Sequence, residues 1–133
     1  MTFRAEEIEQ ILKRLETVPG LEGSALISSD GFMLASSLPP DVSEDRVAAM
    51  GAATLTMAAP IAAMVSVAER VNKELGRGRF ELAIISGGDG YTLATEVGVD
   101  AILIVLASKT AKLGLVFYEV RRAAEDLARV LGR

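Results

Sequence analysis

The sequence predicts an α+β fold with the element order α-β-β-α-β-β-β-α, in one domain spanning residues 1–133. Three observations predict it. Apolar residues recur at helical spacing near each end of the chain, a long alanine-rich segment lies in the middle, and short strand-like runs joined by glycine-containing turns lie on both sides of that segment. Because the chain has 133 residues and no cysteine, its core is expected to consist of aliphatic side chains without disulfides.

The N-terminal segment is expected to be an amphipathic helix that ends before Pro19-Gly20. Its apolar positions have helical spacing and are Ala5, Ile8, Ile11, Leu12 and Leu15. Two strands, at residues 24–29 and 32–36, are then predicted to flank Asp30-Gly31. We interpret this pair as a two-residue type I′ turn, since Gly31 adopts positive φ freely and Asp30 tolerates it. A calcium loop would need further carboxylates at fixed spacing, and only serines precede Asp30.

A long helix is predicted next, starting near Asp41 and ending at Gly76 and Gly78. Three strands then form a meander, followed by a closing amphipathic helix; the expected ranges are 79–86, 91–97, 101–107 and 115–131. The GGDG run at residues 87–90 is interpreted as a hairpin turn. Anion binding by its backbone amides is the alternative, although phosphate loops usually open a helix and carry a lysine.

The central helix contains an uncharged run at residues 47–68, which is long enough to raise the possibility of a membrane span. Its small residues and Pro60 argue against a span. At 100° per residue, one broad arc of the helix is expected to lie on the sheet. This arc comprises Met50, Met57, Ile61, Met64, Val65, Val71 and Leu75.

The opposite side of this helix carries an uncharged stripe of mostly small residues: Ala48, Ala52, Leu55, Ala59, Ala63 and Ser66. A solvated face normally carries charge, so we interpret the stripe as covered by a second copy of the same helix about a two-fold axis. The alternative is a tolerant exposed surface built from alanine, a good helix former. The strand at residues 79–86 is expected to extend this dimer interface, because pairing with its copy would satisfy edge amides. The interface residues predicted there are Arg79, Phe80, Glu81, Leu82 and Ala83.

The composition excludes several classes of function. Without histidine and cysteine, the chain has no thiol nucleophile, no histidine base and none of the usual zinc ligands of those types. The net charge of −4 disfavours binding to nucleic acid. We therefore expect no catalytic residue, no metal and no cofactor. The N-terminus lacks the apolar region of a signal peptide, which predicts a cytoplasmic location.

Several segments together resemble a known family. They are VPGLEGSALISSDGFMLASSLP at residues 18–39, the alanine-rich central helix, DAILIVLASKTAKLG at residues 100–114, and RRAAEDLARVL in the closing helix. The combination is similar to the Roadblock family of dynein light chains and prokaryotic GTPase regulators, over nearly the whole chain. The shared patterns concern turns and core and not catalysis.

The resemblance implies a five-stranded antiparallel sheet with the central helix on one face and the N- and C-terminal helices on the other. It also implies a homodimer in which the third strands pair and the central helices pack together. Prokaryotic members bind small Ras-like GTPases, so a non-catalytic regulator or scaffold is the expected function. Arg77 or Arg79 inserted as an arginine finger is an alternative to a solvated edge charge. A small-molecule sensor of the PAS-like or profilin-like kind is the alternative function, and the scattered aromatic residues disfavour it.

Overall fold

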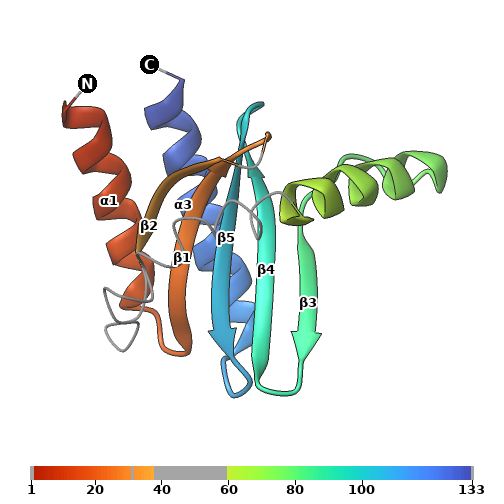
Figure 1. Ribbon diagram of the computed structural model, residues 1–133. Helices are drawn as coiled ribbons and strands as arrows, with labels where there is room; N and C mark the ends of the chain where they lie inside the picture. The colour runs from red at the N-terminus through yellow and green to blue at the C-terminus, as the bar shows by residue number, and fades with distance from the viewer. Residues whose placement is uncertain (1, 31, 38–59, 133) are drawn as a thin grey trace.

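The computed structural model describes residues 2–30, 32–37 and 60–132 of the chain (Figure 1). The elements are α1 (Thr2–Glu16), β1 (Leu21–Ser28), β2 (Met33–Ser37), a helix at residues 60–74, β3 (Ala83–Gly87), β4 (Gly90–Val97), β5 (Ala101–Ser108) and α3 (Leu113–Leu131). The strands form one antiparallel sheet in the order β2-β1-β5-β4-β3. The predicted α+β fold with a five-stranded antiparallel sheet is therefore confirmed.

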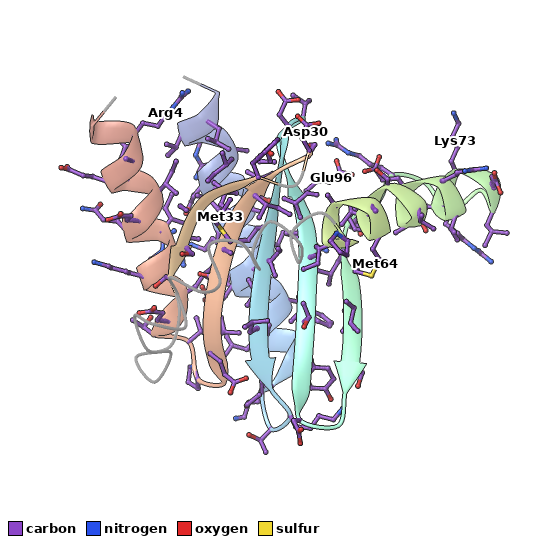
Figure 2. All side chains as sticks on the ribbon, viewed as in Figure 1. Arg4, Asp30, Met33, Met64, Lys73 and Glu96 are labelled. Atoms are coloured by element: carbon purple, nitrogen blue, oxygen red, sulfur yellow. The ribbon has the colours of Figure 1, made fainter. Side chains whose placement is uncertain are left out.

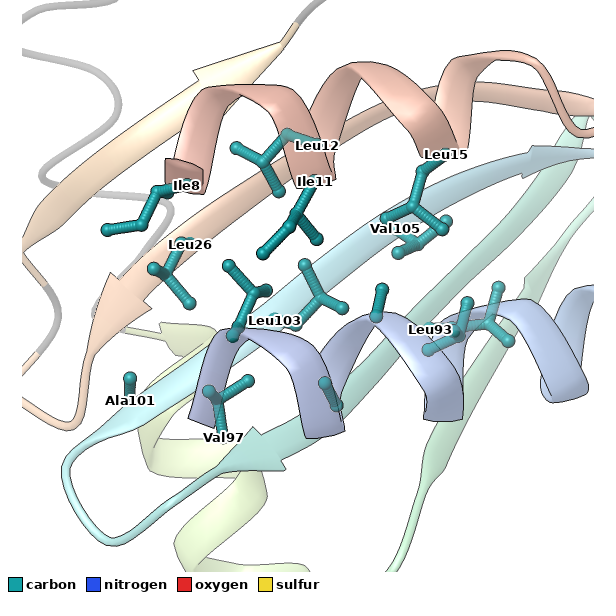
Figure 3. Close-up of a cluster of buried hydrophobic side chains, with 14 of the residues drawn as sticks. Ile8, Ile11, Leu12, Leu15, Leu26, Leu93, Val97, Ala101, Leu103 and Val105 are labelled. Atoms are coloured by element: carbon teal, nitrogen blue, oxygen red, sulfur yellow. The ribbon is translucent and has the colours of Figure 1, made fainter. Parts of the chain in front are cut away.

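One face of the sheet is covered by α1 and α3, which pack side by side (Figures 1 and 3). Aliphatic side chains from both helices meet Leu26, Leu103 and Val105 of the central strands in a continuous buried cluster. α3 buries one full stripe of its surface, namely Val116, Val120, Ala123, Ala124, Leu127 and Val130. This stripe is the face that the helical spacing predicts.

The two terminal helices are also joined by polar contacts. Arg4 of α1 donates from Nε to the carbonyl oxygen of Val130 at 3.3 Å and from a terminal nitrogen to that of Leu131 at 2.7 Å. These carbonyls lie in the last turn of α3, where carbonyl groups lack the usual donors of the helix interior. In the last turn of α1, Arg14 forms an ion pair with Asp126 of α3. The N- and C-terminal segments are thus held together near their ends.

The helix at residues 60–74 lies on the opposite face of the sheet. Ala62 and Val65 are buried against a second cluster that contains Ile102 and Ile104 of β5 and Phe80. This arrangement confirms the predicted layers, with the central helix on one face and the terminal helices on the other. In Figure 1 this helix starts over β4 and then extends past β3, beyond the edge of the sheet.

Of the two predicted hairpin turns, the first differs from the prediction and the second agrees with it. The β1–β2 connection is longer than a two-residue turn, because the Ser28 N–H donates to the Phe32 carbonyl at 2.8 Å and closes a loop of three residues. Asp30 does not have positive φ, so the type I′ prediction is wrong. A register shift between Leu26 and Ile27 accompanies the longer loop. The GGDG turn is confirmed, since Gly87 pairs directly with Gly90 across two connecting residues.

The third strand is shorter than predicted and begins at Ala83 instead of Arg79. Residues 79–82 approach the sheet as irregular chain. There the Thr95 hydroxyl of β4 donates to the Glu81 carbonyl at 2.7 Å. A side-chain donor therefore contacts a carbonyl just ahead of the β3–β4 ladder, which begins with the pair Ala83–Ala94.

Candidate partner-binding surface

The β3 strand forms one edge of the sheet, and in the described part of the chain it pairs only with β4. Its neighbouring residues Ile84 and Ile85 are 44% and 42% exposed. Successive side chains of a strand point to opposite faces, so apolar surface is uncovered on both sides of this edge. An edge of this kind offers unpaired backbone groups and apolar area to another chain.

The apolar surface continues on the helix at residues 60–74. Val67, Val71 and Leu75 are 58%, 46% and 65% exposed, at intervals of four residues that place them on one side. The prediction that Val71 and Leu75 lie on the sheet is therefore wrong. The arc was correct for Val65, which is buried, but Val71 and Leu75 are exposed. The helix extends past β3, so part of it has no sheet beneath it (Figure 1).

The end of this helix is fixed by its glycine. The Arg77 N–H donates to the Asn72 carbonyl at 2.7 Å, and the Gly76 N–H donates to that of Lys73. Gly76 has φ +65°, so this is a Schellman motif that uses the left-handed conformation that glycine adopts freely. The chain can therefore reverse and return to the sheet edge at β3.

The predicted dimer interface falls partly on the described residues. Ala48, Ala52, Leu55 and Ala59 lie outside them. Ala63 and Ser66 are exposed on the helix, next to the buried Ala62 and Val65. The two described residues of the predicted stripe are therefore exposed within the protomer.

The predicted interface residues before and in β3 have different surroundings. Phe80 is buried in the cluster beneath the helix, which leaves its ring little surface for a partner. The Glu81 carboxylate lies 3.8 Å from a guanidinium nitrogen of Arg121 on α3. Leu82 packs partly against the cluster under α3, Ala83 packs partly against the one under the helix, and Arg79 is exposed.

Charged residues gather where the helix crosses the sheet. A cavity of about 580 Å³ there is lined by Glu69, Lys73, Arg79 and Glu96, with Phe80 at its base. Glu96 lies near the end of β4 (Figure 2) and lines this cavity together with Glu69 of the helix. Burial of its carboxyl group raises the pKa of Glu96, the facing carboxyl group of Glu69 raises it further, and the Arg79 guanidinium acts in the opposite direction.

The described residues contain neither a metal-binding cluster nor a membrane-spanning helix. No three carboxylate, histidine or cysteine side chains there gather closely enough to hold a metal ion. Within the same residues, no helix has the length and apolar character needed to cross a membrane. Much of the uncharged run at residues 47–68 lies outside the described residues.

Comparison with known proteins identifies the family. A family model described as the Roadblock/LC7 domain matches residues 7–107. The chain belongs to the Roadblock/LC7 family. The uncharacterized protein MJ1340 of Methanocaldococcus jannaschii is 34% identical over 120 residues, which cover 90% of this chain and 96% of that protein.

The solved structures of Roadblock/LC7-like proteins agree with this fold. The gliding protein MglB from Thermus thermophilus superimposes with a TM-score of 0.80 and 26% identity, covering 96% of this chain and 90% of its own. An MglB described as having a tetrameric arrangement superimposes with a TM-score of 0.78 and 27% identity. The match covers 96% of this chain and 89% of that chain. The predicted Roadblock resemblance is therefore confirmed.

The sequence contains a local signal for the open edge of the sheet. Ile84 and Ile85 are adjacent apolar residues in a strand, and such a strand is normally covered on both faces. This Roadblock/LC7 chain has no second layer over either residue within the described part of the protein. Adjacent isoleucines in this edge strand therefore leave apolar surface exposed on both faces of the described protomer.

Proposed function

We propose that this Roadblock/LC7 protein is a homodimeric, non-catalytic regulator or scaffold that binds a small Ras-like GTPase and changes its nucleotide cycle or location. The dimer is proposed because exposed apolar side chains lie on both faces of β3, at Ile84 and Ile85, and at the helix end, at Val71 and Leu75. Two copies related by a two-fold axis could pair their β3 edges antiparallel and continue the sheet.

The helix supports this arrangement, because its last turns extend past β3. In a β3-paired dimer, Val71 and Leu75 would lie over the sheet of the second copy. Their exposed side chains would then be covered as Ala62 and Val65 are covered in their own protomer. Ala63 and Ser66, which are small and exposed, would leave room for the second helix.

The GTPase partner is inferred from the family resemblance. Regulation of this kind can act by repositioning the switch loops of the GTPase, so it needs no catalytic group from this chain. Arg79 is exposed and stands near the Glu69–Glu96 pair, where it balances carboxylate charge. These neighbouring carboxyl groups favour a local structural role for Arg79 over insertion as an arginine finger.

The small-molecule sensor is the second candidate. Cavities that bind such ligands are mostly apolar and enclosed. The cavity of about 580 Å³ beside the helix has a lining rich in charged side chains and includes two glycines, which favours the regulator over the sensor.

Affinity capture of a cognate GTPase from the source cell, followed by nucleotide assays with the purified pair, tests the proposal. We expect the protein alone to hydrolyse no GTP, and the hydrolysis or exchange rate of the GTPase to change when the protein is added. The double variant Arg77→Ala, Arg79→Ala should keep most of this effect. Binding without any change of rate or location would contradict the regulator, and loss of stimulation with retained binding would identify an arginine finger.

A further inference from the structure

A small cavity marks the junction between the helix at residues 60–74 and the sheet. Its volume is about 90 Å³, and Ser66 and Glu69 of the helix line one side of it. Glu96 of β4 and Ile102 of β5 line the other side, together with Ser29 from the β1–β2 connection. The Ser29 N–H donates to the Asp100 carbonyl at 2.8 Å, which ties that connection to the β4–β5 turn. The junction is thus built on a fixed end of the sheet.

Glu69 lies between the buried part of the helix and its exposed end. The residues before it, such as Val65, are buried on the sheet, whereas Val71 and Leu75 beyond it are exposed. Glu69 is therefore near the last helical residue to meet the sheet of its own protomer.

Two carboxyl groups, one arginine and one lysine lie around this junction. Glu69 and Glu96 line the same small cavity, and the Glu69 carboxyl group raises the pKa of Glu96 through a hydrogen bond and through like charge. Two ionised carboxylates cannot make such a hydrogen bond, because neither has a proton to donate. Arg79, from the chain before β3, acts on Glu96 with opposite charge, and Lys73 lines the wider cavity one turn further along the helix. The lining residues from β5, Ala101 and Ile102, are uncharged.

We propose that Glu69 and Glu96 form a proton-operated latch between the helix and the sheet. When one proton is shared, a carboxyl group of one residue donates to the carboxylate of the other and holds the helix against β4. When that proton leaves, two like charges face each other and the end of the helix is released more easily. The latch does not depend on the identity of any partner.

The direction of the effect follows from the electrostatics. The pKa of Glu96 lies above its usual value in the folded protein, through burial first and Glu69 second. A group with a raised pKa stabilises the folded arrangement below its ordinary pKa, and this contribution is lost as the pH rises through the raised value. The latch therefore closes on acidification, opposite to the effect of carboxylates held in ion pairs.

Hydrogen exchange and carboxyl NMR test the latch on the full-length protein. Protection factors of the amides at residues 66–74, corrected for intrinsic exchange, are measured between about pH 4.5 and about pH 7.5, with α3 as internal reference. We expect several-fold higher protection of the helix at the acidic end, relative to α3, and a titration of the Glu96 carboxyl above the range of an ordinary glutamate.

Two variants separate the latch from a general charge effect. In Glu69→Gln, the amide can donate to the Glu96 carboxylate at any pH, so the helix should be protected at neutral pH and the pH dependence should disappear. Glu74→Gln removes a charge from the same helix, where Glu74 pairs with Arg70 on an exposed surface, and should keep the parental pH dependence. Helix protection that is independent of pH in the parent, or a pH dependence that survives Glu69→Gln, would overturn the proposal.

Discussion

The helix α3 and the helix at residues 60–74 both pack on the sheet, but they end differently. α3 keeps its apolar stripe buried from Val116 to Val130. The other helix buries Ala62 and Val65 and then carries its remaining apolar side chains past β3. The contrast extends to the strands beneath them, since Leu103 and Val105 are fully buried whereas Ile84 and Ile85 are not.

This difference separates two kinds of apolar residue in one small protein. The residues between α3, α1 and the sheet stabilise the protomer, because their surface is removed from water within the chain. Those on β3 and the helix end retain surface that a second chain can bury. Substitutions in the first region should therefore change unfolding, and those in the second should change association.

The largest expected effect is that of Leu127→Ala, in the buried face of α3. Removing this side chain should lower the free energy of unfolding by about 2–5 kcal/mol, through lost burial and a cavity. Leu75→Ala on the exposed helix end is the matched control. Its smaller effect in urea unfolding should grow with protein concentration, because an interface stabilises by mass action. If both variants lost the same free energy of unfolding at every protein concentration, the proposed difference between the α3 core and the helix end would be contradicted.

Two glycines at positive φ give a second comparison, one in each region. A Cβ at Gly20 would lie 2.6 Å from the Ala111 Cβ and 2.9 Å from its Cα, whereas a Cβ at Gly76 would meet no atom within 4 Å. Both Ala variants should lose about 1–2 kcal/mol to the backbone conformation. Gly20→Ala should lose at least about 1 kcal/mol more through overpacking. Thermal unfolding of the two variants side by side measures the difference, and equal losses would contradict the close approach.

The smallest effects are expected from ion pairs. Arg14→Ala breaks the pair with Asp126 that joins α1 to α3, and should cost within about 1 kcal/mol because the guanidinium is half exposed. Arg70→Ala removes a surface-exposed pair with Glu74 within one helix and should cost about 0.3–0.5 kcal/mol. A loss above about 2 kcal/mol for Arg14→Ala would mean that the polar contacts, and not the aliphatic cluster, hold the two helices together.

Much of this fold could be predicted from local patterns. The helical spacing of Ile8, Ile11, Leu12 and Leu15 identified the buried face of α1, and turn glycines marked the strand connections. Such signals are local because they reflect the period of one element and the backbone freedom of one residue. The layer arrangement came from the family resemblance and was confirmed.

The errors arose where tertiary geometry overrides a local period. Val71 and Leu75 continue the apolar arc of Val65, and a helical projection cannot show that the sheet ends before they reach it. Strand β3 was predicted four residues too early, since Phe80 and Leu82 alternate as in a strand but belong to irregular chain. The Glu69–Glu96 contact joins residues from different elements, and no spacing in the sequence indicates it.

In the proposed dimer, β3 and the helix end form an interface with a second copy. Light scattering across a concentration series should give about twice the chain mass of 14.0 kDa for the parent. Ile85→Lys, at the open edge, should shift the protein toward the monomer mass. Tyr118→Lys, which replaces an exposed aromatic residue of α3, should leave it dimeric. A monomeric parent at micromolar concentration, or an Ile85→Lys variant as dimeric as Tyr118→Lys, would contradict this account.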